Sequence, residues 1–178
     1  MPSWDKCRRA FAWVDRLPPR LVVAVATLGP VGHWGRAPGT NGTAAGLLYF
    51  ILLYPWLPLP AAIFALLVSL YLAVAFCDGA EIRLNQRDPG CVILDEVVAI
   101  PFCFFGVLAA AHAHNWPVWT VLLAGFALFR FFDILKPLGI HRIQHLPGGL
   151  GVVADDIAAA LATCVVLNLV IRIPWTAL

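Results

Sequence analysis

Seven of the ten acidic residues of this 178-residue chain lie at or near the ends of apolar stretches. Asp95 and Glu96 are the clearest pair, because apolar residues flank them on both sides and no basic residue is adjacent. A charged residue inside a membrane costs roughly 2.5–3.5 kcal/mol on insertion scales, so acids in apolar stretches indicate function. The seven residues are Asp78, Glu81, Asp95, Glu96, Asp133, Asp155 and Asp156.

The chemistry that such a set favours is the binding of a divalent cation. Clustered carboxylates repel one another unless protons or a cation intervene, and Mg²⁺ prefers oxygen ligands of this kind. Each acid alone has a simpler structural explanation, because an acid at a helix N-terminus gains about 0.3–1 kcal/mol from the helix dipole. That explanation covers Asp95, Asp155 or Asp156 singly, but it does not cover the whole set.

Two glycine-rich segments and two basic residues indicate that the same site binds an anion. Residues 35–43 form a glycine-rich loop that runs into the first apolar stretch, and residues 147–151 precede Asp155. Glycines let backbone N–H groups approach an oxyanion, although a plain turn with an N-cap explains such a segment equally well. Arg130 and Lys136 flank Asp133 at three-residue spacing. Carboxylates, a metal and these cations together favour phosphoryl transfer on a lipid.

The composition indicates that a membrane-embedded fold positions these residues. The chain is 61% hydrophobic and only 12% charged, with a mean hydropathy of +0.85, whereas soluble domains carry roughly 25% charged residues. This composition excludes a water-soluble globule, and disordered or nucleic-acid-binding chains need still more charge. The formal net charge of +2 identifies no partner. The five cysteines have no C-x-x-C spacing, so neither a disulfide framework nor a metal–thiolate site is expected.

Apolar stretches supply five expected helices. Residues 43–77 carry no formal charge, and the prolines between 55 and 60 divide them into a helical hairpin. The other stretches are Val92–Ala111, Val118–Phe132 and Val152–Ile171. We therefore expect an all-α, polytopic membrane bundle of about 4–5 apolar helices, with four spans plus a re-entrant helix as an acceptable variant. Residues 1–20 predict a basic cytosolic N-terminal tail, with a signal peptide as the alternative, and residues 21–178 predict one membrane-embedded domain.

The distribution of basic residues predicts the orientation. Lys and Arg occur in the tail and in the segments 78–90 and 130–150, whereas the connections at 55–60 and 112–117 carry none. The positive-inside rule then places the N-terminus and the polar loops in the cytoplasm. We expect the acidic site at the cytoplasmic end of the bundle.

Four segments together resemble the phosphatidylglycerophosphatase A family of bacterial lipid phosphatases. They are Ala-Pro-Gly-Thr-x-Gly-Thr at 37–43, Asp-Pro-Gly at 88–90 followed by Asp-Glu-Val-Val at 95–98, Phe-Arg-Phe-Phe-Asp-Ile-Leu-Lys-Pro at 129–137, and Gly-Gly-Leu-Gly-Val-x-x-Asp-Asp at 148–156. The resemblance covers about residues 25–165 in the family's order. It implies a multi-pass enzyme of the bacterial inner (cytoplasmic) membrane with Mg²⁺ as cofactor and a phospholipid as substrate.

The activity that this resemblance implies is a phosphoric monoester hydrolysis in glycerophospholipid biosynthesis. Water attacks the terminal phosphate of phosphatidylglycerophosphate, and phosphatidylglycerol and inorganic phosphate are released. The resemblance leaves open the oligomeric state, the number of metal ions and the identity of the general base.

The resemblance also implies roles for individual residues. The expected metal ligands, one of which could instead be the base that orients water, are Asp95, Glu96, Asp155 and Asp156, with Asp133 as a further ligand or base. Glu81 and Asp88 match acids of the family's upstream loop and are additional metal-ligand candidates. Arg130 and Lys136 would clamp the phosphate. The residues that would cradle it through N–H groups are Gly39, Thr40, Gly42 and Thr43.

Three departures from the family pattern are visible. Gly35 stands where a proline is usual, and Thr43 replaces a serine while keeping the hydroxyl. The segment 139–147 is about one residue short and offers Gln144 where the family often has an acid. The last departure weakens any role assigned to that segment.

Two alternatives remain open from the residues. Asp78-Gly79-x-x-x-Arg83 resembles the start of the signature of CDP-alcohol phosphotransferases, but the following spacing does not match. An ion- or proton-coupled transporter would also contain intramembrane acids. A transporter would place them at the midplane beside broken helices, whereas these acids gather at one end of the expected bundle.

Overall fold

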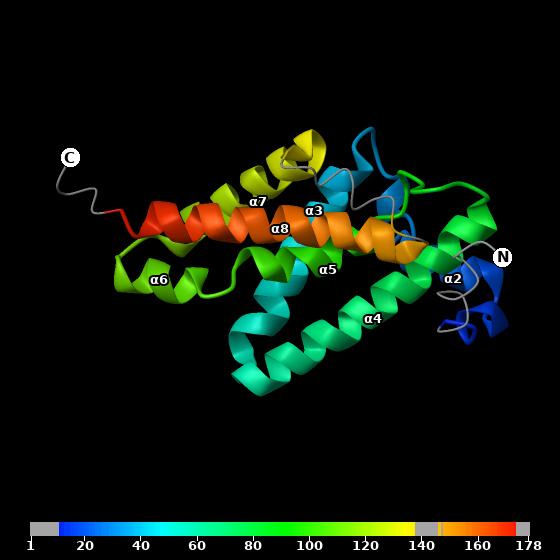
Figure 1. The fold of residues 1–178 in the computed structure, drawn as a ribbon, viewed down its shortest axis with the longest axis horizontal. Coiled ribbons are helices and arrows are strands. Elements are labelled where there is room, and N and C mark those ends of the chain that lie inside the picture. Colours follow the sequence, from blue (N-terminus) through cyan, green and yellow to red (C-terminus); the bar gives the residue numbers. More distant parts are fainter. Residues whose placement is uncertain (1–10, 138–145, 147, 174–178) are drawn as a thin grey trace.

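The computed structural model describes residues 11–137, 146 and 148–173, and within them it is entirely helical (Figure 1). Three single 3-10 turns, η1 (Val14–Arg16), η2 (Val31–His33) and η3 (Tyr54–Trp56), separate or precede the longer helices. The α-helices are α2 (Pro19–Ala26), α3 (Pro38–Leu53), α4 (Leu59–Leu84), α5 (Leu94–Cys103), α6 (Val107–Ala113), α7 (Val118–Leu135) and α8 (Gly149–Ile171). The expected all-α fold is confirmed.

Among the residues that the structure describes, four helical segments are long and apolar enough to cross a membrane. They are α4, α5 with α6 taken together as Leu94–Ala113, α7 and α8. Helix α3 has 16 residues and rises only ~24 Å, which is less than the ~30 Å of a bilayer's hydrocarbon core. The structure therefore corresponds to the variant with four spans and one shorter helix.

Two boundaries differ from the sequence-based expectation. The first apolar helix begins at Pro38, so residues 39–43 lie in its first turns and not in a loop; proline is favourable at a first helical position because its missing N–H is not needed there. The stretch Val92–Ala111 is not one helix either. It breaks after Cys103, and the chain resumes as α6 behind Gly106, whose φ of +69° favours glycine.

Helix α8 lies at the centre of the bundle, and it packs against α4, α5 and α7. In Figure 1 it runs across the middle of the view, with α7 on one side and α5 on the other. Helix α3 packs mainly against α5 and crosses it at a steep angle in the same view. The helices α3, α5, α7 and α8, whose polar ends carry the candidate site residues, are therefore neighbours in the bundle.

The described part of the N-terminal tail packs onto the bundle. Val14 is buried, and Arg83 of α4 donates hydrogen bonds to the carbonyls of Val14 (2.9 Å) and Leu17 (3.5 Å). Trp13 stacks on Tyr71 and donates its indole N–H to the tyrosine hydroxyl at 2.9 Å. Residues 1–10 of the expected tail lie outside the described residues.

Candidate functional site

One cavity of about 120 Å³ collects most of the acids singled out from the sequence. Its walls come from the loop before α5, the first turn of α5, the end of α7 and the second turn of α8. The lining residues are Asp88, Gly90, Val92, Asp95, Glu96, Asp133, Lys136, Val152, Asp155 and Asp156. We call this the acidic cavity. Six carboxylates and one ammonium therefore face a space of a few water molecules.

The acids of α5 and α8 are buried deeply. Asp95, Asp155 and Asp156 are 5%, 3% and 5% exposed. Within the described part of the chain, three buried oxygens have no hydrogen-bond partner, namely Asp95 Oδ1, Glu96 Oε2 and Asp156 Oδ2. Burying a polar oxygen without a partner is unfavourable, so such atoms indicate an ion, a proton or a ligand that the site is built to receive.

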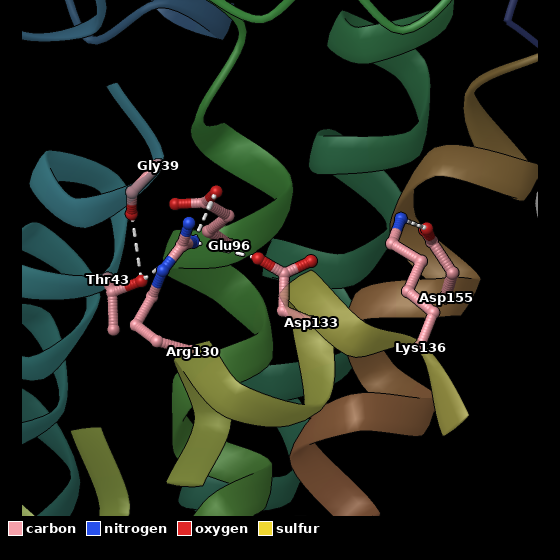
Figure 2. Close-up of polar contacts among 7 residues, drawn as sticks. All are labelled: Gly39, Thr43, Glu96, Arg130, Asp133, Lys136 and Asp155. Atoms are coloured by element: carbon pink, nitrogen blue, oxygen red, sulfur yellow. Dashed lines mark hydrogen bonds and ion pairs between the residues drawn. The ribbon is translucent and has the colours of Figure 1, made fainter. Parts of the chain in front are cut away.

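Arg130 of α7 ties three helices together at one wall of this cavity. Its Nη1 lies 3.0 Å from Glu96 Oε1 and 2.8 Å from Asp133 Oδ2. The same nitrogen donates a longer hydrogen bond, 3.4 Å, to the hydroxyl of Thr43, which in turn donates to the carbonyl of Gly39 at 2.8 Å (Figure 2). Within the described residues, the buried Arg130 Nε has no partner, so the guanidinium retains a donor beyond its two carboxylates.

The glycines of α3 make this arrangement possible by leaving room for Glu96 and Arg130. A Cβ at Gly39 would lie 2.7 Å from Arg130 Nη1, and one at Gly42 would lie 2.9 Å from Ile93 Cβ and 3.1 Å from Glu96 Cδ. Gly46, one turn further on, would place a Cβ 3.0 Å from Val97 Cα. Close packing of α3 on α5 is thus the structural use of these glycines.

The phosphate cradle expected from residues 39–43 remains a prediction. Thr40 is exposed at the start of α3, and its N–H already donates to the carbonyl of Ala37 at 3.0 Å. Thr43 is fully buried beneath Arg130. The segment contributes a helix N-terminus next to the cations, which still favours an anion through its dipole.

Lys136 approaches the cavity from the end of α7 and pairs with Asp155 (Figure 2). It ends the helix in a left-handed conformation, with φ of +42°. Burial disfavours the charged ammonium, but the hydrogen bond and charge of Asp155, together with Asp156 and Asp133, raise the pKa of Lys136 above its usual value. The carboxylates around Lys136 therefore favour its charged form.

The two acids of the upstream loop behave differently from each other. Asp88 lines the acidic cavity, with a φ of +46°. Glu81 accepts the backbone N–H of Asp88 through Oε1 at 2.7 Å and so holds this loop from α4. Residues 138–145 and 147, which include Gln144, lie outside the described residues.

Asp78 has a role that the sequence did not reveal. Its Oδ1 accepts the backbone N–H of Gly149, the first residue of α8, at 3.1 Å. A Cβ at Gly149 would lie 2.5 Å from the Asp78 nitrogen, and Gly148 has a φ of +62°. Asp78 therefore caps the helix that carries Asp155 and Asp156. The double glycine was the available signal, because it permits this close approach of two chains.

The donor set fits a hard divalent cation. The acidic side chains of the cavity offer only oxygen atoms as ligands, and the three unpartnered buried oxygens named above are among these atoms. Among the residues that the structure describes, no group of three or more His, Cys, Asp or Glu is arranged to hold a metal ion. Mg²⁺ usually keeps several waters and takes one or two carboxylates plus substrate phosphates, so a site for it does not require such a group.

Comparison with known proteins relates the chain to one family. The family model described as Phosphatidylglycerophosphatase A matches residues 24–171. A Bacteroides thetaiotaomicron protein, provisionally named a phosphatidylinositol-3-phosphatase, is 34% identical over 134 residues, which cover 74% of this chain and 81% of the relative. Phosphatidylglycerophosphatase A of Haemophilus influenzae is 35% identical over 132 residues (74% and 77%). The Escherichia coli protein of that name is 27% identical over 131 residues (73% and 72%). No solved structure matches the chain.

Proposed function

The chain belongs to the phosphatidylglycerophosphatase A family, and on that basis we propose that it hydrolyses the terminal phosphate of phosphatidylglycerophosphate to give phosphatidylglycerol and inorganic phosphate. The single observation that carries this proposal is the acidic cavity, in which six carboxylates, Lys136 and the nearby Arg130 meet at one end of the long apolar helices. A phosphomonoester on a lipid headgroup is a ligand that fits both the charges and the position.

Mg²⁺ is part of this proposal. Asp95, Glu96, Asp155 and Asp156 would hold it, with Asp88 and Glu81 as additional candidates, and the unpartnered oxygens of the cavity support this assignment. When bound, such an ion neutralises phosphoryl oxygens and lowers the pKa of water. It would also offset the repulsion among the buried carboxylates.

The protein's own residues would perform the remaining tasks. Arg130 keeps its Nε as a free donor for a phosphate oxygen while Nη1 is held by Glu96 and Asp133. Lys136 supplies a second positive charge across the cavity. One of the carboxylates, with Asp133 included, would accept a proton from the attacking water. Fixed cations and an oriented water are sufficient for phosphoryl transfer because little covalent chemistry is required of the protein.

We place the enzyme in the bacterial inner (cytoplasmic) membrane with the cavity facing the cytoplasm. The support is the distribution of basic residues, since Arg83, Arg87 and Lys136 flank the cavity end while the connections at 55–60 and 112–117 carry no Lys or Arg. Neither the CDP-alcohol phosphotransferase nor the transporter alternative is supported by the family match.

The test is phosphate release by the full-length protein purified in detergent. We expect release from phosphatidylglycerophosphate with Mg²⁺ and none in excess EDTA, with activity restored when Mg²⁺ is added back. Phosphatidylinositol 3-phosphate is assayed in parallel because one relative carries that name, and we expect it to be the poorer substrate. No release from phosphatidylglycerophosphate under any condition would refute the proposed activity, and full activity in EDTA would refute the metal.

A further inference from the structure

A second cavity, of about 250 Å³, lies at the opposite end of the α3–α5 pair. Its walls come from the end of α3, the η3 turn, the start of α4, and the break between α5 and α6. Tyr54 is the only lining residue with a polar side chain among those that the structure describes, and the rest are apolar, including Phe50, Ala62, Phe104 and Leu108. We call this the apolar cavity.

Contacts from α8 stabilise the break between α5 and α6 that forms this cavity. An interruption of an apolar span frees backbone groups, which must find partners because lipid offers none. Asn168 of α8 donates its amide to the carbonyl of Phe105 at 3.2 Å, and the Cys164 thiol lies 3.4 Å from the same oxygen. Gly106 supplies the left-handed residue that turns the chain. The break is thus a stabilised feature that leaves space beside Phe104.

The two cavities lie at opposite ends of the same pair of packed helices, α3 and α5. Along α3 and into the η3 turn, the residues at positions 39, 43, 46, 50 and 54 recur at the helical period and run from the contact with Arg130 to the apolar cavity. The corresponding series along α5 is Glu96, Ile100 and Phe104, the last of which caps the helix. At a rise of 1.5 Å per residue, Phe50 lies ~10 Å beyond Thr43 and Phe104 lies ~12 Å beyond Glu96.

These offsets along the helix axes exceed the thickness of a headgroup layer. That layer is about 5–8 Å thick on each side, so ~10–12 Å is far enough to reach from a headgroup into the acyl chains. The seam between α3 and α5 is thus polar where a phosphate would be held and apolar at the depth where a fatty acid chain would run. A single amphipathic ligand, such as a phospholipid, has groups that suit both ends.

We propose that the apolar cavity binds one fatty acyl chain of the same lipid molecule whose phosphate is bound at the acidic cavity. This inference rests on the proposed function and adds a second subsite, for the acyl chain, to the proposed active site. A chain seated against Phe50, Phe104 and Leu108 fixes the depth and direction of the headgroup. The cavity then selects diacyl lipid over the free headgroup by packing contacts, since transfer from bilayer to protein brings no hydrophobic gain.

The test fills the cavity and compares two substrates. Ala62→Trp places an indole in the cavity from α4, and the matched control is Leu67→Trp, on the same helix but 59% exposed. The substrates are long-chain phosphatidylglycerophosphate in mixed micelles and its water-soluble deacylated headgroup. We expect Ala62→Trp to raise KM for the lipid about tenfold, equivalent to losing roughly a dozen carbon–carbon contacts. Turnover of the headgroup should equal that of the control.

Photolabelling provides the second measurement. A phosphatidylglycerol carrying a diazirine in mid-chain should crosslink to the segment 101–108 in the parent protein and in Leu67→Trp, but not in Ala62→Trp. A phosphatidylcholine with the same chain is the control for bulk lipid and should label this segment weakly.

The outcomes separate the two proposals. Equal labelling by both lipids, or an Ala62→Trp variant that treats the lipid and the headgroup like the control does, overturns the acyl-chain site and leaves the phosphatase assignment intact. If Ala62→Trp loses the same fraction of activity on both substrates relative to Leu67→Trp, the acyl-chain site is also overturned, because a site for an acyl chain cannot affect a substrate that has none. If neither the parent protein nor any variant hydrolyses either substrate, the proposed function itself is wrong. Ala62→Leu replaces Ala62→Trp if the latter does not fold.

Discussion

The two ends of the α3–α5 seam differ in side-chain size and in charge. At one end the glycines at 39, 42 and 46 bring the helices so close that Glu96 and Arg130 fill the space where side chains of α3 would be. At the other end Phe50 and Phe104 stack with ring centroids 4.7 Å apart and hold the helices apart beside the apolar cavity. The volume of the α3 side chains thus decides where the seam is closed and where it is open.

The two ends also differ in what they contribute to stability. The apolar end is stabilised by packing, as the buried aromatic rings show. The acidic end gathers buried carboxylates that repel one another, and only Arg130 and Lys136 offset this repulsion among the described contacts. Sites of this kind trade stability for function. Changes at the acidic end should therefore reduce activity while sparing or even raising stability.

The largest expected effect comes from Asp156→Asn. The amide keeps the shape of the side chain but removes one of the charges facing the acidic cavity. Phosphate release should fall at least about 100-fold, the scale on which metal-site residues act. Because one repelling charge is gone, the melting temperature in EDTA should rise above that of the parent protein, as measured by intrinsic fluorescence in detergent.

Asp15→Asn is the matched control, since Asp15 lies outside the cavity and half-exposed. It should leave activity unchanged and alter the melting temperature only slightly, because its 4.0 Å ion pair with Arg83 is half-exposed. An active Asp156→Asn variant would remove this residue from the site. A variant that lost both activity and stability would contradict the contrast between the two ends.

The second-largest effect is expected from Gly42→Ala, in the closely packed part of the α3–α5 seam. Gly42→Ala adds a methyl group where Glu96 and Ile93 already lie, so α3 or Glu96 must move. Displacement of a positioned group by about 1 Å can cost up to 100-fold in rate, and we expect kcat to fall between about 10- and 100-fold. Ala44→Val on the exposed side of the same helix is the control. Unchanged kcat in Gly42→Ala would show that the position of Glu96 does not matter.

Arg130→Lys tests whether shape or charge matters at the acidic end. Lysine keeps the positive charge but has one nitrogen in place of three: Nη1 of Arg130 alone contacts Glu96, Asp133 and Thr43, and Nε is an additional donor that lysine lacks. We expect KM to rise about tenfold, because donors to the phosphate are lost while the charge remains. Arg87→Lys in the exposed upstream loop is the comparison variant. If Arg130→Lys matched the parent in KM, the arginine would act as a point charge only.

The sequence was sufficient for the features that depend on composition. Asp95, Glu96, Asp155 and Asp156 interrupt apolar stretches, and such interruptions are visible without coordinates. Their convergence on one cavity follows because each lies near the same end of a neighbouring helix. The all-α fold follows from the length of the apolar runs.

What the sequence did not predict depends on contacts between distant residues. In the stretch 92–111 only Pro101 and Gly106 signal a break, and the contact that supports the break is not local: Asn168 lies 63 residues away from Phe105. Helix α3 begins earlier than expected because proline starts helices as readily as it ends them. Asp78 looked like a member of the acidic set, yet its partner Gly149 is 71 residues away.

The smallest expected effect concerns that hydrogen bond, which supports the acidic end from outside the cavity. Asp78→Ala removes the acceptor for the Gly149 N–H at the start of α8, a loss of about 1 kcal/mol by analogy with helix caps. Asp78→Asn keeps an oxygen acceptor and removes only the charge. We expect Asp78→Ala to lower the melting temperature and to reduce kcat about fivefold, since a frayed α8 no longer fixes Asp155 and Asp156. Asp78→Asn should keep most of the parent protein's thermal stability and most of its kcat. If the asparagine variant were as impaired as the alanine variant, the charge of Asp78 would be what matters, and this residue would act on the cavity directly and not through the helix that it caps.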